Sequence, residues 1–236
     1  MLEQIEVETN PNPDWAIIWL HGLGADGTDF VDAIPELNLP ESAAIRFIFP
    51  HAPVIPVTCN GGYQMRAWYD ILAFEPLRRI DLAGLIAARA EIRTLIAQER
   101  LRGIPARRIL LAGFSQGGSL AYAAALTHPE RLAGLIALST YLPAPEHFIP
   151  EFTPSNADLP IFIAHGAHDD IVAPQLGQVA YDTLCQAGYC PQWKLYRNLP
   201  HAIDREQLRE IGKWIAERIQ TTSQQITSPK AGHPPT

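Results

Sequence analysis

The pentapeptide Gly113-Phe114-Ser115-Gln116-Gly117 constrains the fold of this 236-residue chain more than any other feature. It follows an apolar run, 108–112, that predicts a buried strand, and it precedes an alanine-rich run that predicts a helix. A serine in this setting, with glycine two residues to either side, is typical of a nucleophile elbow. The sharp turn lifts the hydroxyl clear of the sheet, and glycines let strand and helix approach closely. The motif therefore predicts a nucleophilic serine at Ser115.

Short apolar runs alternate with longer segments of helical period along the rest of the chain. This alternation is typical of a mostly parallel sheet with helices on both faces. With 47% apolar residues, we expect a single domain over 1–220, and a disordered tail over the polar, proline-rich residues 221–236. The predicted strands are 15–20, 45–49, 108–112, 135–139, 161–164 and 193–196.

The N-termini of two helices are predicted from capping residues. Asp81 is placed to cap a helix with one apolar stripe, which leaves Arg89 to face water. Asp204 with Gln207 three residues later predicts a capping box at the start of the last helix. Both helices are expected to cover the sheet.

Charge and hydropathy exclude several classes of protein. A net charge of -7 argues against a broad surface for nucleic acid. The acidic start is unlike a signal peptide, and no run approaches the ~18 apolar residues of a membrane span, so we expect a cytoplasmic protein without stable membrane insertion. The three cysteines are interpreted as reduced, and no metal site is predicted: Cys59, Cys185 and Cys190.

A serine nucleophile requires a general base and a carboxylate to orient it. On the α/β-hydrolase fold the acid and then the histidine follow the serine, at the carboxyl ends of later strands. Among the eight histidines, only His201 and His233 follow a plausible acid, and His233 falls in the predicted tail. We therefore expect His201 to be the base. The acid is Asp169 or Asp170, and position alone does not choose between them.

Acyl transfer also needs two main-chain N–H groups that face the developing negative charge. One comes from the residue after the nucleophile, Gln116, and the other from a loop after an early strand. The strand 15–20 opens into a loop over 21–27 that contains three glycines, so we expect the second donor near Leu23. This loop lacks the spacing and the lysine of a phosphate-binding loop, and no nucleotide is predicted.

Four segments in this order resemble the phospholipase/carboxylesterase/thioesterase family, particularly its small bacterial carboxylesterases. The likeness covers roughly residues 5–218, and the four segments together are far more specific than any one of them. They are H-G-L-G-A-D-G (21–27), N-G-G-Y-Q-M-R-A-W-Y-D (60–70), G-F-S-Q-G-G (113–118) and H-G-A-H-D-D-I-V (165–172).

The resemblance implies an esterase without a cofactor or metal, acting on carboxylic esters; some relatives cleave acyl-protein thioesters or lysophospholipids. It maps the triad acid to Asp169 and leaves Asp170 unassigned. A homodimer is left open, because relatives often dimerise, but the sequence locates no interface. The other family positions map to Ser115 as nucleophile, His201 as base, and the main-chain N–H groups of Leu23 and Gln116 as oxyanion donors.

One position departs from the family. Pro200 stands directly before His201, where the family usually has glycine. Because proline fixes φ near −65° and pushes Leu199 towards an extended conformation, the loop cannot use a glycine-only geometry here. A displaced imidazole with weakened activity is left open, and some activity is still expected.

The substrate is expected to be a small or lipid-like ester. Only about 21 residues, rich in proline, separate the strands 135–139 and 161–164, too few for a helical cap domain, so the site should be open. An apolar run near position 70 is interpreted as a ridge that contacts an acyl chain, and the open alternative is a satellite core cluster. The run comprises Met65, Trp68, Tyr69, Ile71, Leu72 and Phe74.

The sequence thus predicts a serine carboxylesterase that acts through an acyl-enzyme. An acyl-protein thioesterase or lysophospholipase would use the same triad. A non-catalytic binding protein on a hydrolase fold is the alternative from another class, and Pro200 is its main support.

Overall fold

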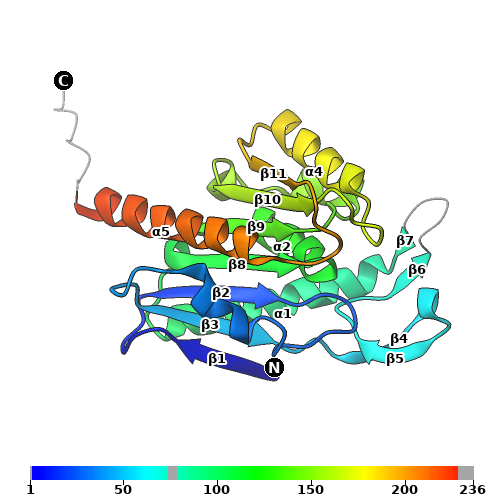
Figure 1. Cartoon of the computed structure of the whole chain (residues 1–236), viewed down its shortest axis with the longest axis horizontal. Coiled ribbons are helices and arrows are strands. Elements are labelled where there is room, and N and C mark those ends of the chain that lie inside the picture. The colour runs from blue at the N-terminus through cyan, green and yellow to red at the C-terminus, as the bar shows by residue number, and fades with distance from the viewer. Residues whose placement is uncertain (1, 74–78, 228–236) are drawn as a thin grey trace.

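The computed structural model describes residues 2–73 and 79–227, and a seven-stranded sheet forms its centre (Figure 1). The strand order is β1-β3-β2-β8-β9-β10-β11. All neighbouring pairs are parallel except β1 with β3, which is antiparallel. The strands are β1 (Gln4–Glu8), β2 (Trp15–Leu20), β3 (Ile45–Pro50), β8 (Ile109–Phe114), β9 (Gly134–Leu138), β10 (Ile161–Gly166) and β11 (Gln192–Tyr196). The predicted mostly parallel sheet is confirmed.

Five of these strands lie within two residues of the predicted bounds, and β2 matches them, but the sequence did not reveal the edge strand β1. Two small hairpins beside the sheet were also missed, because their strands are short and half-exposed. They are β4 (Val54–Val57) with β5 (Tyr63–Arg66), and β6 (Ile71–Ala73) with β7 (Arg79–Ile80).

Helices cover both faces of the sheet. One apolar cluster holds the inward sides of α1 (Leu82–Leu101), α2 (Gln116–Leu126) and α4 (Pro174–Gln186). The cluster on the opposite face holds α5 (Arg205–Thr227) and the 3-10 helix η1 (Val31–Leu37). The remaining short elements are η2 (Thr58–Asn60), η3 (Ala106–Arg108), α3 (Pro145–Phe148), η4 (Ile149–Glu151) and η5 (Pro154–Asn156).

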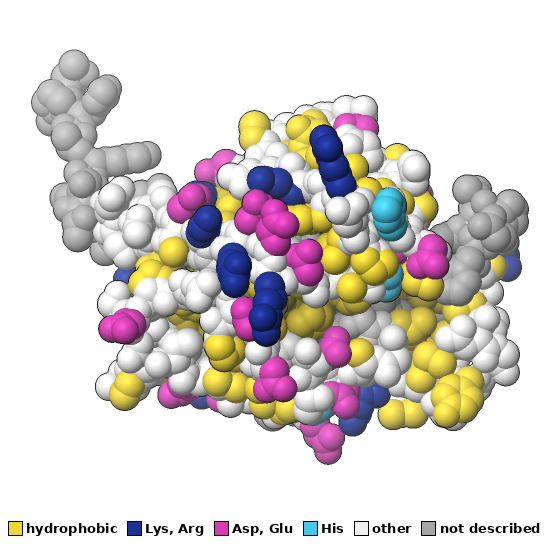
Figure 2. Space-filling model, viewed as in Figure 1, with side chains coloured by type: hydrophobic (Ala, Val, Ile, Leu, Met, Phe, Trp, Pro, Cys, Tyr) yellow, Lys and Arg dark blue, Asp and Glu magenta, His cyan; other side chains and the backbone are white. Residues whose placement is uncertain are grey.

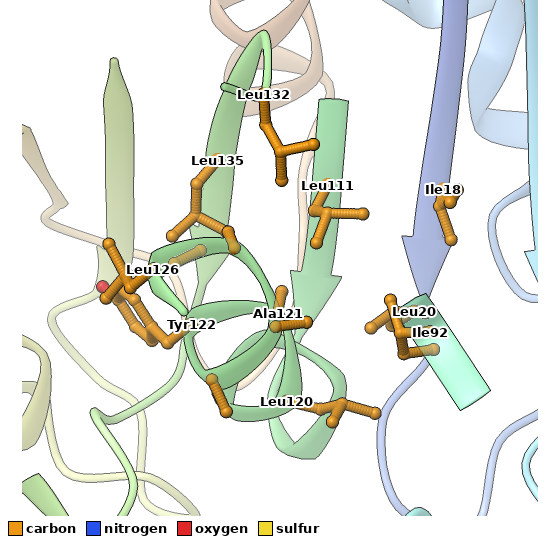
Figure 3. Close-up of a cluster of buried hydrophobic side chains, with 14 of the residues drawn as sticks. Ile18, Leu20, Ile92, Leu111, Leu120, Ala121, Tyr122, Leu126, Leu132 and Leu135 are labelled. Atoms are coloured by element: carbon orange, nitrogen blue, oxygen red, sulfur yellow. The ribbon is translucent and has the colours of Figure 1, made fainter. Parts of the chain in front are cut away.

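Helix α2 lies at the centre of its cluster, and every one of its residues is buried. Figure 3 shows Leu120, Ala121 and Tyr122 of α2 beside Leu111 of β8 and Leu135 of β9. Small alanine side chains let this helix lie close to the sheet, as interiors of native density require. The helix that follows Ser115 is therefore fixed firmly in the core.

The helix-start predictions have mixed outcomes. The Gln207 N–H donates to Asp204 Oδ1 at 2.8 Å, so Asp204 caps α5. The Gln207 side chain makes no return bond to any described residue, so the second half of the predicted capping box is absent. Asp81 precedes α1 but makes no side-chain capping bond. Arg89 was wrongly expected to face water: it is 8% exposed and pairs with Glu151, which lies 62 residues further along the chain.

The predicted tail boundary at residue 220 was wrong. Helix α5 continues to Thr227, because the residues 221–227 include neither proline nor glycine. Hydroxyls on the added turns bond back to carbonyls four residues earlier, as from Thr221 to Glu217. Residues 228–236 of the predicted tail lie outside the described residues.

The segment between β9 and β10 carries only α3 and two single 3-10 turns, in line with the expectation of no large cap. Figure 2 shows positive and negative side chains interspersed over the face that carries α5. No helix within the described residues is long and apolar enough to cross a membrane.

Candidate active site

Four loops meet at one edge of the sheet, because parallel strands place their carboxyl ends together. The loops follow β2, β8, β10 and β11. The last three carry Ser115, Asp169 and His201, and the first is the glycine-containing loop at 21–27.

The three polar side chains form a continuous hydrogen-bonded chain. The Nε2 atom of His201 lies 3.0 Å from Oγ of Ser115, and its Nδ1 atom lies 2.7 Å from Oδ2 of Asp169. The Asp169 side chain is fully buried, whereas Asp170 is exposed to solvent. Of the two candidate acids, Asp169 is therefore the one in contact with the imidazole.

The serine sits on a strained turn. Ser115 has φ 54° and ψ −121°, a conformation that residues with a side chain rarely adopt. Its N–H donates to Leu138 O at 2.9 Å, and its carbonyl accepts from the Thr140 hydroxyl at 2.6 Å. A Cβ on Gly117 would lie 2.3 Å from Leu20 O, so the turn packs directly against the end of β2. The predicted elbow geometry is present.

Four groups hold the Asp169 carboxylate. Oδ1 accepts from the N–H groups of Ile171 at 3.0 Å and Val172 at 2.8 Å. Oδ2 faces His201 and also the buried His165, whose Nε2 lies 3.3 Å away. Burial alone would raise the pKa of Asp169, but bonds from His165, His201 and Val172 outweigh it and hold that pKa well below its ordinary range. The carboxylate is ionised in neutral solution.

The contact between His165 and Asp169 was not predicted from the sequence. Its imidazole is fully buried, and Nε2 also lies 2.8 Å from Val172 O. A histidine four residues before the acid could have suggested this contact, but the bond depends on how the loop after β10 folds back.

Pro200 does not displace the imidazole, which answers the question that the sequence left open. The Leu199 carbonyl accepts from His168 N at 3.0 Å, and the Pro200 carbonyl accepts from Ala202 N at 2.8 Å. Neither Pro200 nor His201 has a positive φ, so the loop needs no glycine here. Carbonyl acceptors fix this loop, and a proline keeps its carbonyl.

The predicted oxyanion donors sit on two anchored segments. No hydrogen bond in the described part of the chain uses the main-chain N–H of Leu23 or of Gln116. Both segments are bonded to a third, residues 66–69. The Gln116 side chain accepts from Trp68 N at 2.9 Å and donates to Tyr69 O at 2.7 Å. Gly24 N donates to Arg66 O at 2.8 Å.

His21 fixes the start of this loop from inside. It is 1% exposed, its Nε2 accepts from Ala52 N at 3.0 Å, and its Nδ1 lies 2.7 Å from Gly22 O. Trp68 donates its indole N–H to His21 O at 2.9 Å. Desolvation lowers the pKa of His21 to about 4, so the ring is neutral at pH 7.

The apolar run near position 70 is divided rather than a continuous exposed ridge. Trp68 and Tyr69 are 3% and 1% exposed and belong to the core, which corrects the prediction of a ridge for these two. Their polar atoms bond to the loops around them, which draws both rings inward. Met65 is half-buried near Gly24, and Leu72 is 40% exposed. Phe74 lies outside the described residues.

A mainly apolar groove of about 630 Å³, which we call the Tyr141 groove, has Tyr141 in its lining. Tyr141 follows Thr140, the residue that holds the Ser115 carbonyl. Arg79 and Glu146 supply the charged part of the lining. Its apolar lining includes Leu72, Ile80, Leu82, Leu142, Leu176 and Val179.

The described residues hold no group of three side chains that could bind a metal ion, and they contain no disulfide among the cysteines Cys59, Cys185 and Cys190. The site itself brings together the serine, the imidazole and the carboxylate, beside main-chain N–H groups. Together they provide a nucleophile, a base and donors for an anion.

Comparison with known proteins identifies the family. The family model described as Phospholipase/Carboxylesterase matches residues 3–219. The chain belongs to this family. Its fold is the α/β-hydrolase fold, as predicted, and the protein is a serine hydrolase of the carboxylesterase and thioesterase type with a triad-like network.

The similar proteins include both thioesterases and carboxylesterases. The chain is 39% identical to Acyl-protein thioesterase 1 of Neurospora crassa over 214 residues, which cover 86% of each protein. It is 34% identical to Carboxylesterase SOBER1 of Arabidopsis thaliana over 209 residues, or 88% of this chain and 92% of the relative.

Solved structures give the same picture. The crystal structure of Arabidopsis thaliana SOBER1 matches with a TM-score of 0.82 at 33% identity and covers 87% of this chain and 99% of that one. The crystal structure of Zea mays acyl-protein thioesterase 2 matches with a TM-score of 0.81 at 27% identity and covers 93% and 100%.

Proposed function

We propose that this protein is a carboxylesterase that hydrolyses carboxylic esters through an acyl-enzyme on Ser115. The observation that carries the proposal is the unbroken chain of short contacts from Ser115 Oγ through His201 to Asp169, at 3.0 Å and 2.7 Å. A hydroxyl within reach of an imidazole, itself held by a buried carboxylate, is the arrangement that activates serine.

The reaction proceeds in two steps. As Ser115 Oγ attacks the ester carbonyl carbon, His201 Nε2 takes the hydroxyl proton, and Asp169 stabilises the imidazolium. His201 then gives that proton to the leaving oxygen as the C–O bond breaks and the alcohol departs. A water molecule, deprotonated by His201, attacks the acyl-enzyme, and Ser115 Oγ leaves with the proton as the acid is released.

The N–H groups of Leu23 and Gln116 donate to the oxyanion in both steps. Each such donor contributes ~10² to 10³ in turnover. The Gln116 side chain and the bonds of His21 hold the two donors in place, so the donors are organised before substrate arrives.

The acyl chain of the substrate lies in the Tyr141 groove. Its walls are mostly apolar, and its volume of about 630 Å³ suits a medium or long chain better than an acetyl group. Leu72 lines the groove, and Met65 lies above the oxyanion loop beside Gly24. We propose Leu72 and Met65 as the substrate contacts within the apolar run, while Trp68 and Tyr69 support them from the core.

Acyl-protein thioesterase activity is the second candidate. It is favoured by the 39% identity to Acyl-protein thioesterase 1 of Neurospora crassa, and it uses the same attack on an acyl carbon. The values of kcat/KM for nitrophenyl esters of increasing chain length, a palmitoyl-peptide thioester and a lysophospholipid separate these activities.

The Ser115→Ala variant tests the proposal. We expect the turnover of a nitrophenyl octanoate ester to fall by ~10⁵ or more, because the acyl-enzyme cannot form. Ser119→Ala is a matched control, since that hydroxyl is buried in the first turn of α2 and makes no contact with His201. Ester turnover that survives in folded Ser115→Ala would refute the assigned nucleophile.

A further inference from the structure

A second pocket of about 320 Å³ adjoins the catalytic imidazole, and we call it the His201 pocket. His201 itself forms part of its wall, and the Phe114 ring lies 4.7 Å from the imidazole, centre to centre. The pocket shares no lining residue with the Tyr141 groove. Its apolar walls come from Phe30, Ala33, Phe114, Ile203 and Leu208.

The direction of proton transfer assigns this pocket to one half of the substrate. In the proposed reaction His201 Nε2 must protonate the leaving oxygen, so that oxygen lies beside the imidazole. The body of the leaving alcohol then extends along the wall that His201 shares. The acyl half departs towards the Tyr141 groove instead.

One charged group of the His201 pocket has no counter-ion among residues 2–73 and 79–227. Asp29 lines the pocket with an exposed side chain, and no cation of the described residues affects its carboxyl. Partial desolvation raises the pKa of Asp29, and the nearby charge of Asp26 adds to the effect. Arg205, at the start of α5, forms an ion pair with Glu36 instead, with Nε of Arg205 3.3 Å from Oε1 of Glu36.

We propose that the His201 pocket binds the alcohol half of the substrate and selects a compact cationic alcohol, such as a quaternary amino alcohol. The inference rests on the proposed esterase function. An unbalanced carboxylate beside apolar and aromatic walls attracts an ammonium group and repels an anion. The volume of about 320 Å³, half that of the groove, fits a small head rather than a chain.

The experiment compares two esters of the same fatty acid that differ only in the charge of the alcohol. One is the choline ester, and the other is the 3,3-dimethylbutyl ester, in which carbon replaces the charged nitrogen. We expect the kcat/KM ratio of choline to neutral ester to be ~5 to 10 in the wild type, since a partly exposed charge contact contributes about 1 kcal/mol. The ratio should fall as salt is added.

Two variants identify the source of that preference. Asp29→Asn keeps the size of the side chain and should bring the ratio to about 1. Asp32→Asn removes the same charge from an exposed neighbour that does not line the pocket, so it should keep the wild-type ratio. Equal ratios in wild type and Asp29→Asn, or an equal loss in Asp32→Asn, would overturn the inference.

Labelling with a fluorophosphonate separates this failure from failure of the proposed function. If Ser115 is labelled and the neutral ester is hydrolysed without any preference for choline, only the charge selection is wrong. If neither ester is hydrolysed and Ser115 takes no label, the esterase proposal falls, and the inference falls with it.

Discussion

The turn at Ser115 and the pair Asp169–His201 reach the same point of the molecule by different means. The turn is held by its own backbone: the Ser115 N–H and carbonyl are both bonded, and Gly117 packs against Leu20 O. The acid and base come from two loops 32 residues apart, and side-chain hydrogen bonds hold them.

This difference predicts how each part fails. A turn that depends on close backbone approach tolerates no added carbon, and it breaks sterically. Loops that depend on hydrogen bonds tolerate a change of residue type, such as Pro200, as long as the acceptors remain. These loops should lose function when a charged side chain is replaced by a neutral one of the same shape.

Asp169→Asn should have the largest effect on turnover, and it tests whether the Asp169 and His201 loops depend on charge. Removing the charge leaves the imidazolium without its partner, so kcat should fall by ~10⁴, or about 5 kcal/mol. Asp170→Asn is the matched control and should leave kcat unchanged, because its side chain is exposed. Measured ester turnover decides; an inactive Asp170→Asn beside an active Asp169→Asn would reverse the assignment.

Gly117→Ala tests whether the turn at Ser115 depends on close backbone approach. A Cβ there would lie 2.3 Å from Leu20 O and 2.5 Å from His21 O, so the free energy of unfolding should drop by more than about 3 kcal/mol. Gly103→Ala is the control, since it has open space around it but a φ of +100°, and it should cost about 1 kcal/mol. Urea denaturation measures both; equal losses would contradict the packing argument.

The oxyanion loop gives a pH-dependent prediction. The pKa of His21 is lowered from 6.5 to about 4 in the folded state, mainly by desolvation. As pH falls from 6.5 to 4, His21 is protonated in the unfolded chain but stays neutral in the folded chain. The free energy of unfolding therefore declines by about 3 kcal/mol over this range. Above pH 6.5 this contribution is constant.

Urea denaturation at pH 7 and pH 4.5 measures the decline. His21→Asn should be less stable at pH 7 but should lose less stability on acidification than the wild type. His168→Gln removes an exposed histidine from a neighbouring loop and should keep the wild-type pH dependence. An unchanged pH dependence in His21→Asn would show that the ring is not held neutral.

Pro200→Gly restores the residue usual in the family and should have the smallest effect. Because the loop is held by carbonyl acceptors, kcat/KM should stay within about threefold, while stability falls by about 1 kcal/mol through a freer unfolded chain. Ester kinetics and thermal unfolding check the two parts. A tenfold rise in kcat would mean that Pro200 does disturb the imidazole.

The parts of the molecule that follow local rules could be predicted from sequence. The strand-turn-helix around Ser115 and the position of His201 after the last strand are set by spacing along the chain. The strand β2 and the cap at Asp204 are equally local.

What escaped prediction depends on partners far apart in sequence. Arg89 looked solvent-facing because Glu151 lies 62 residues away, and β1 is a strand only because β3 offers it an edge. The contact of His165 with Asp169 needs the folded loop after β10. The consequence of Pro200 could not be judged without knowing which groups of the loop accept hydrogen bonds.

The central claim is that His201 activates Ser115 in the folded protein. Its most direct test is the rate of fluorophosphonate labelling, with the adduct located by peptide mass spectrometry, in the wild type and in His201→Gln. We predict one adduct on Ser115 and a labelling rate at least ~10³ lower in the variant. An unlabelled Ser115 in folded wild-type protein, or equal rates in the two proteins, would contradict the claim.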